Sequence, residues 1–190
     1  MKMKKTLSAA FLIILLAFSI LPNSLSAASG SREYQNANKL FGEGRFPEAI
    51  QAYQQVLSAT SRNIPLHIVH TRIADSYFRM DDYAQALGSY QAALNAQKPS
   101  ERAPTQYWIG FCTFLLGRDA QAVIEFLKIP EQYPSSGMWV GTGYYWAARA
   151  SERMGNKHQA AEFYGKAAGN GKSTQERFAL KKAAAVKSSK

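Results

Sequence analysis

The side chains that could carry chemistry in this sequence include a histidine pair and a single cysteine. His67 and His70 lie three residues apart and could share a helix face, but two histidines without a third ligand do not make a metal site. Cys112 lies in the apolar stretch around Phe111 and Phe114, where a thiol stays protonated and unreactive. One cysteine cannot form an internal disulfide. These residues predict no metal site, and we expect no bound cofactor.

An aspartate pair and two glycine-rich segments do not assemble a catalytic site either. Asp81 and Asp82 lie in a segment typical of a turn. The glycine pairs at 42/44 and 141/143 lack a preceding strand, so they are not phosphate-binding loops. No Ser–His–Asp or Cys–His arrangement is suggested. The sequence therefore predicts a protein that is not an enzyme and that has no small-molecule substrate.

One pattern returns four times and indicates the elements on which these side chains lie. A turn residue is followed by an alanine and, one helical turn later, by an aromatic residue. The alanines are 37, 36 and 38 residues apart, and they are Ala49, Ala86, Ala122 and Ala160. The aromatic residues that follow them are Tyr53, Tyr90, Phe126 and Tyr164. A period of roughly 34 to 40 residues with this content predicts stacked pairs of antiparallel helices.

The positions around each alanine predict how a pair packs. A small residue in the first helix lets the two helices approach closely, and these residues are Ala37, Ala74, Gly110 and Ala148. We expect the aromatic residue of the second helix to fill the space between one pair and the next. Phe46 and Tyr83 should plug the first two turns, whereas Asp119 and Lys157 predict looser turns in copies three and four. Pro130 predicts that the second helix of copy three ends early.

The two ends of the chain differ from the repeats. Three lysines, an apolar run and small residues near Ala27 and Ala28 predict a secretory signal peptide over residues 1–28, with an uncleaved membrane anchor as the alternative. The repeat domain then spans residues 29–170. Residues 171–190 open with Ser173 and Glu176 in a capping-box pattern, so they predict a basic C-terminal helix and tail that caps the array.

The net charge of +10 is unevenly distributed, and the C-terminal end carries more than half of it. From residue 166 onward seven lysines and arginines face one glutamate, while residues 29–165 are nearly neutral. An evenly basic surface would favour nucleic acid, which this distribution does not. A basic tail on an exported protein instead points to an anionic envelope surface, to an acidic partner, or to no more than solubility.

The repeats resemble the tetratricopeptide repeat family. Residues 44–53 and 82–94 match its turn, its Glu-Ala-Ile or Gln-Ala-Leu core and its following aromatic residue. Segments around Tyr107, Tyr133 and Tyr145 resemble exported bacterial members, such as the Tol–Pal coordinator, envelope-assembly repeat proteins and the helical domain of soluble lytic transglycosylases. The resemblance implies an all-α fold: a right-handed α-solenoid of about four helix pairs plus a C-terminal capping helix.

In this family the first helices line the concave face, where partners bind. Carried over by position, the expected partner-binding groove comprises Tyr34, Asn38, Phe41, Thr71, Asp75, Phe78, Arg79, Tyr107, Phe111, Phe114, Tyr145, Arg149 and Glu152. Aromatic and arginine side chains are frequent binding anchors, although aromatic stripes at helical spacing also form cores. Asp75 replaces an asparagine of the family's carboxylate clamp, so capture of an acidic C-terminal tail is not supported.

The sequence thus predicts an exported, periplasmic or extracellular scaffold. Its groove would bind a peptide or helix of a partner protein in assembly or maintenance of the bacterial cell envelope. The alternative is an accessory module for cell-wall glycan or an anionic envelope polymer, which would use the aromatic groove and the basic tail.

Overall fold

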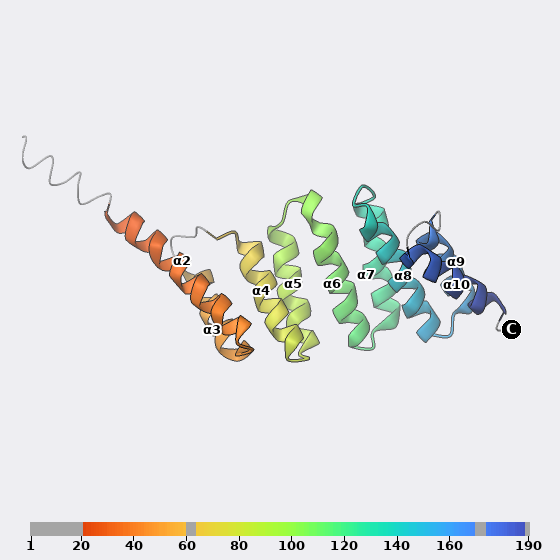
Figure 1. The fold of residues 1–190 in the computed structure, drawn as a ribbon, viewed down its shortest axis with the longest axis horizontal. Helices are drawn as coiled ribbons and strands as arrows, with labels where there is room; N and C mark the ends of the chain where they lie inside the picture. Colours follow the sequence, from red (N-terminus) through yellow and green to blue (C-terminus); the bar gives the residue numbers. More distant parts are fainter. Residues whose placement is uncertain (1–20, 60–63, 170–173, 189–190) are drawn as a thin grey trace, which may run out of the picture. The chain divides into compact units, whose positions relative to one another are not determined.

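The structure is a computed structural model that describes residues 21–59, 64–169 and 174–188. Within these ranges the regular elements are nine α-helices and one short 3-10 helix, and no strand. The chain divides into two compact units, residues 1–65 and 66–190. Helices follow one another as antiparallel hairpins (Figure 1).

The first unit contains one hairpin, α2 (Leu21–Gly42) and α3 (Phe46–Ser58). The Phe41 and Phe46 rings meet edge-on at 5.5 Å across the turn, which confirms Phe46 as its plug. The Tyr53 hydroxyl donates a hydrogen bond to Asn38 Oδ1 at 2.7 Å, so the two helices are also joined by a polar contact.

The predicted signal peptide lies mostly outside the described residues, which begin at Leu21. The backbone of α2 passes through the predicted cleavage site in this full-length chain, and cleavage stays a prediction. No helix in the described part of the chain combines the length and apolar character needed to cross a membrane.

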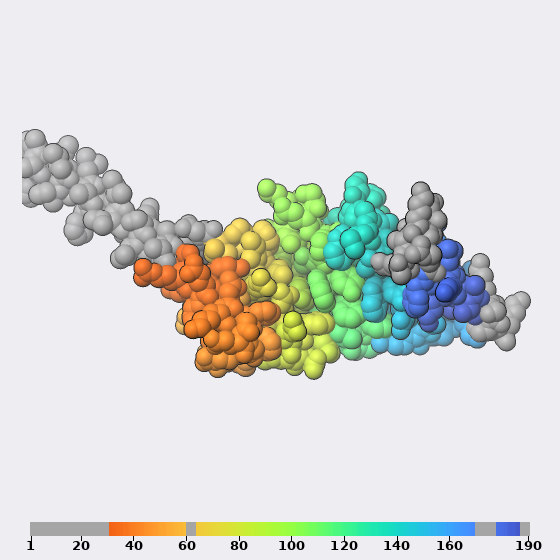
Figure 2. Space-filling model, in the orientation of Figure 1, coloured from red at the N-terminus to blue at the C-terminus, as the bar shows by residue number. Residues whose placement is uncertain are grey.

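The second unit contains three hairpins and a final helix. Its elements are α4 (Leu66–Arg79), α5 (Tyr83–Ala96), η1 (Pro99–Glu101), α6 (Arg102–Leu115), α7 (Asp119–Gln132), α8 (Met138–Arg153), α9 (Lys157–Ala168) and α10 (Thr174–Ser188). Each helix packs on the next, and α6 also touches α8, the first helix of the following pair. In the space-filling view the successive segments of this unit lie against one another (Figure 2).

Each turn within a hairpin contains one residue in the left-handed region. The values of φ are 76° at Gly44, 58° at Asp81, 74° at Gly117 and 77° at Gly155. Glycine adopts this conformation without a steric cost, and aspartate tolerates it better than most residues. The repeated turn residue of the sequence is therefore the residue that reverses the chain.

The repeated alanines and aromatic residues form the core of the hairpins. All four alanines are fully buried, and the four aromatic side chains are at most 1% exposed. Gly110 lies directly against the Phe126 ring, where an added Cβ would approach ring carbons to 2.7 Å. The small residue of the first helix is thus what lets the aromatic ring of the second helix fit.

Pro130 lies inside α7, so the predicted early end of this helix was wrong. The helix continues to Gln132, and the Tyr133 N–H donates to the Ile129 carbonyl at 2.9 Å. Proline removes only the hydrogen bond that its own nitrogen would donate to the carbonyl four residues earlier, that of Phe126. Gly143 of α8 packs on this carbonyl and on the Pro130 ring, so tertiary packing covers the interruption.

The turn between α6 and α7 also differs from the expectation. Asp119 stands where copies one and two have an aromatic plug, and its carboxylate binds Arg153 of α8. Arg153 Nε lies 2.7 and 2.8 Å from the two carboxylate oxygens. The guanidinium also donates to the Phe114 carbonyl and lies 3.6 Å from the centre of the Phe114 ring. An ion pair and a hydrogen bond from Arg153 of the next hairpin therefore take the place of the missing aromatic ring.

Candidate partner-binding surface

Six aromatic side chains of the first helices in the second unit form one connected cluster. We name this cluster the aromatic face; it comprises Phe78 of α4, Tyr107, Trp108, Phe111 and Phe114 of α6, and Trp146 of α8. Five of the six are half-buried, and Phe114 is buried. Helical spacing along α6 directs several rings to one side, and the contact of α6 with α8 extends the cluster to the next pair.

Phe111 lies at the centre of the aromatic face. Its ring centroid is 4.7 Å from that of Trp146, 5.7 Å from that of Tyr107 and 6.1 Å from that of Phe78. The Trp146 contact is edge-to-face, and the other two are stacked, which are the favoured geometries for aromatic pairs. Rings held in this way lose little further freedom when a partner covers them, which suits them to binding.

Tyr107 links this face to the core of the third hairpin. Its ring contacts those of Phe126 at 6.1 Å and of Trp139 at 5.6 Å. Burial raises the pKa of the Tyr107 hydroxyl, so the side chain is a neutral phenol at physiological pH. Tyr107 therefore belongs both to the core of the third hairpin and to the aromatic face.

Three polar members of the predicted groove have structural roles. The Tyr90 hydroxyl donates to Asp75 Oδ1 at 2.7 Å, which repeats the contact of Tyr53 with Asn38 in the first unit. Thr71 donates its hydroxyl to the His67 carbonyl within α4. Burial raises the pKa of Asp75, although the Tyr90 hydrogen bond and nearby arginines act in the opposite direction.

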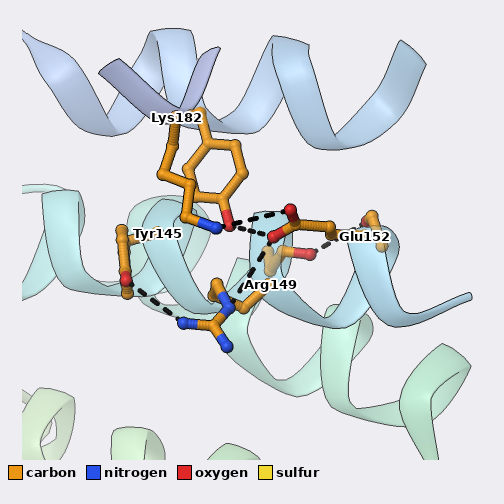
Figure 3. Close-up of polar contacts among 7 residues, drawn as sticks. Tyr145, Arg149, Glu152 and Lys182 are labelled. Carbon is orange, nitrogen blue, oxygen red and sulfur yellow. Dashed lines mark hydrogen bonds and ion pairs between the residues drawn. The ribbon is translucent and has the colours of Figure 1, made fainter. Parts of the chain in front are cut away.

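The last hairpin and α10 carry a polar cluster beside the aromatic face (Figure 3). Glu152 accepts a hydrogen bond from the Tyr164 hydroxyl at 2.6 Å and an ion-pair contact from Lys182 Nζ at 3.5 Å. Burial alone would raise the pKa of Glu152, but these donors outweigh it, and the pKa lies below its usual value. Glu152 is therefore a charged acceptor that ties α10 to α8 and α9.

Arg149 belongs to the same cluster but is held loosely. Its Nε lies 3.8 Å from Glu152, and its Nη1 lies 3.5 Å from the Tyr145 hydroxyl, toward which Figure 3 shows the guanidinium turned. The guanidinium also lies 6.0 Å from the Trp146 ring centre. Arg149 thus connects the polar cluster with the edge of the aromatic face.

The structure distributes the predicted groove residues between the two units. Phe78, Tyr107, Phe111 and Phe114 meet in the aromatic face, while Tyr145, Arg149 and Glu152 lie in the adjoining polar cluster. Arg79 is exposed at the end of α4. Tyr34, Asn38 and Phe41 belong to the first unit, where the Tyr34 ring contacts Tyr53 at 5.9 Å. That these residues bind a partner stays a prediction.

Sequence reasoning missed two tryptophans and one lysine of this region. Trp146 lies three residues before Arg149, so helical periodicity could have placed it on the predicted face. Trp108 follows Tyr107 directly, and its ring stacks on that of Tyr90 at 5.9 Å. Lys182 meets Glu152 across 30 positions of sequence, and no local pattern signals such a contact.

The structure also locates the Cys112 thiol and the side chains that could bind a metal ion. Cys112 is a free thiol that is fully buried, and burial raises its pKa to about 12. Among the described residues no group of three or more histidines, cysteines, aspartates or glutamates is placed to hold a metal ion.

A cavity of about 290 Å³ lies among the connections between pairs, and none of the predicted groove residues lines it. It is lined by Pro99, Ser100, Gln132, Tyr133, Pro134, Ser135 and Ser136. Its walls are uncharged and mostly exposed, so they offer a ligand little beyond shape.

Family models of the tetratricopeptide repeat match the chain at residues 71–137 and 142–169, together half of its length. The chain belongs to the tetratricopeptide repeat family. The matched ranges cover the three hairpins of the second unit from Thr71 onward, and the hairpin of α2 and α3 lies outside them. The all-α repeat fold predicted from the sequence is confirmed.

Solved structures show the same fold at low sequence identity. A crystal structure of MamA matches with a TM-score of 0.57 and 18% identity, over 80% of this chain and 94% of that one. The apo form of RapI matches with a TM-score of 0.74 and 13% identity over 94% of this chain, which spans about half (52%) of RapI. The first TPR of Spaghetti (RPAP3), bound to the HSP90 peptide SRMEEVD, matches at 0.52 and 19%, over 68% and 95%. At these identities the likeness shows the fold alone.

Membership of this family defines the class of protein. Tetratricopeptide repeats typically form non-catalytic scaffolds for protein–protein interaction, and protein partners are the ligands of such domains. The chain is therefore placed among protein-binding helical scaffolds.

Proposed function

We propose that this chain is an exported adaptor of the bacterial cell envelope that binds a peptide or helix of a partner protein on its aromatic face. The observation that carries the proposal is the cluster around Phe111, in which five half-buried rings pack on one another and still present surface. A partner helix or extended segment could place apolar side chains against these rings. The proposed export rests on the charged, apolar and small-residue pattern of residues 1–28.

Position-specific crosslinking tests where the partner binds. Benzoylphenylalanine is placed at Tyr145, which adjoins Trp146 at 5.8 Å, and in a control protein at Ile124 of α7, which is 60% exposed. After irradiation in an envelope fraction, we expect one protein to crosslink from position 145 and not from position 124. Equal crosslinking from both positions would overturn the proposed surface.

A second variant asks whether the aromatic face itself binds. Phe111→Leu removes the central ring but keeps an apolar side chain, so it disturbs the core less than alanine does. With the fold checked by circular dichroism, this substitution should abolish the crosslink from position 145. A crosslink that survives it would show that binding does not use the aromatic face.

The basic tail supports the alternative, binding of an anionic polymer or cell-wall glycan. Lys181 is exposed on α10, whereas Lys182 is engaged with Glu152. Polymer binding through the tail should weaken steeply with salt and on Lys181→Gln, and should persist in Phe111→Leu. Binding on the aromatic face should show the opposite pattern.

Export is tested separately from binding. The full chain is expressed in a bacterial host, and the N-terminus of the protein outside the cytoplasm is sequenced. We expect it to begin after Ala27 or Ala28. Recovery of the intact N-terminus in the membrane fraction would favour the uncleaved anchor.

A further inference from the structure

The fourth hairpin lacks a hydrogen bond that the first two hairpins share. Fifteen residues before the aromatic residue of the second helix, Asn38 and Asp75 accept the hydroxyl of Tyr53 and Tyr90, each at 2.7 Å. The corresponding residue in the fourth hairpin is Arg149, which cannot accept a hydrogen bond.

The Tyr164 hydroxyl bonds to a different residue in consequence. It donates to Glu152 Oε2 at 2.6 Å, one helical turn beyond Arg149. Arg149 therefore takes no part in the kind of contact that joins the two helices in the first two hairpins. Its only hydrogen bond within the described residues is the 3.5 Å contact to Tyr145, at the limit of hydrogen-bond distance. Most of its five N–H donors remain available.

The charges around Arg149 do not balance. Glu152 is the carboxylate of this cluster, and it is shared by Arg149, Lys182 and the Tyr164 hydroxyl. Among the side chains that the structure describes, two cations and one anion leave an excess of one positive charge. About 39% of the Arg149 side chain is exposed, so an incoming carboxylate can reach the guanidinium without displacing Glu152.

Trp146 and Tyr145 precede Arg149 by three and four residues on α8, so helix geometry places them on either side of it. On one side its guanidinium adjoins Trp146, which packs on Phe111 at 4.7 Å. On the other side Tyr145 contacts Phe178 of α10 at 6.1 Å, and Phe178 is 48% exposed. A chain that covers both sides must continue past Arg149 in both directions.

We propose that Arg149 binds the side-chain carboxylate of an internal acidic residue of the partner, whose apolar neighbours on either side cover Trp146 and Phe178. This inference rests on the proposed function and adds the chemistry of the bound segment to it. Arginine suits the role because its planar fork can bind both oxygens of a carboxylate. Arg149 is then a specificity residue, and the rings supply most of the contact area.

Selection from a random-peptide phage library on the intact chain tests the proposal. We expect the recovered peptides to share an aspartate or glutamate with aromatic or aliphatic residues on both sides. Selection on Arg149→Ala should keep the apolar preference and lose the acidic one. A selected peptide, made synthetically, should bind Arg149→Ala about tenfold more weakly than the wild type.

Three controls make the outcome specific. Arg118→Ala, which removes an exposed arginine from a turn and changes the net charge equally, should leave peptide affinity unchanged. Arg149→Glu should restore affinity for a peptide whose acidic residue is replaced by lysine. Amidation of the peptide's C-terminus should have no effect, because the proposed ligand is internal.

The results separate this inference from the function on which it rests. Peptides that require Phe111 but show no acidic preference would overturn the role of Arg149 and leave the aromatic face as the binding surface. Affinity that depends on a free C-terminus would also overturn it, in favour of terminal-carboxylate recognition. If no recovered peptide is lost on Phe111→Leu, both proposals are wrong.

Discussion

Gly143 offers a direct test of how α8 packs against the interrupted helix α7. A Cβ added at this position would lie 2.8 Å from the Phe126 carbonyl oxygen, 3.1 Å from the Ile129 Cβ and 3.3 Å from the Pro130 Cδ. The nearest atom belongs to the backbone, and Phe126 and Ile129 are fully buried. Relief of the clash therefore requires α7 and α8 to move apart.

The expected change in the free energy of unfolding of Gly143→Ala combines two opposite effects. Replacing glycine by alanine inside a helix stabilises it by about 1 kcal/mol when the side chain meets open space. Forcing an extra methyl group into a packed core costs about 1–3 kcal/mol. Because the crowded atom is a backbone carbonyl, we expect the upper half of this cost, and Gly143→Ala should lower the free energy of unfolding by about 1–2 kcal/mol.

The chain contains a matched control for this substitution. Gly88 lies inside α5, is exposed, and has no atom within 4 Å of its added Cβ. Gly88→Ala should therefore raise the free energy of unfolding by about 0.5–1 kcal/mol. The two variants share the same chemical change and differ only in the space around it.

Urea unfolding followed by circular dichroism measures both values, and thermal unfolding provides a second reading. The two substitutions should shift the unfolding midpoint in opposite directions. If Gly143→Ala is as stable as Gly88→Ala, the close approach of α8 to the Phe126 carbonyl does not exist in solution, and Gly143 does not cover the interruption at Pro130.

Three further predictions concern charged and buried groups. Because burial raises the pKa of Asp75, the folded state holds its proton more tightly than the unfolded state, and stability falls as pH rises through the raised pKa. Asp75→Asn keeps an acceptor for Tyr90, so the stability of this variant relative to wild type should increase as pH rises above about 4, the ordinary pKa of aspartate; a decrease in urea titrations would refute this. Arg153 and Asp119 should show a coupling free energy of about 1 kcal/mol in a double-mutant cycle of stability, and Arg153→Lys should lose most of it. Additive effects of the two substitutions would contradict the ion pair between these residues. Cys112 should react with iodoacetamide far more slowly in the native chain than in denaturant, and equal rates would show that its thiol is accessible.

The elements of the fold could be predicted because their signals are local. A left-handed turn residue, a small residue and an aromatic residue recur at fixed offsets in each pair, and the aromatic side chain is buried in all four. Ala86, for example, is fully buried because a helix of this register brings every such alanine against its partner helix. Four copies of this local pattern were therefore enough to predict the whole array of hairpins.

The two wrong predictions, at Pro130 and Asp119, concern residues whose local structure depends on a contact from another hairpin. Pro130 is a helix breaker in isolation, but Gly143, thirteen residues later, packs on the carbonyl that the proline leaves without its usual donor. Asp119 predicts a loose turn, but Arg153 of the next pair binds it. Neither partner could be chosen from the sequence, because many glycines and arginines lie at similar separations.

By itself, the sequence determined the class of the protein: an all-α array of repeated hairpins, without a recognisable catalytic constellation, with aromatic residues along its first helices. Periodicity and turn chemistry act over a few residues, so they can be read directly from the chain. Only the tertiary structure decided which rings join into one face around Phe111, and that the Tyr164 hydroxyl bonds to Glu152 and not to the residue at position 149. These outcomes depend on the distances between side chains of different helices, which packing sets and sequence spacing does not.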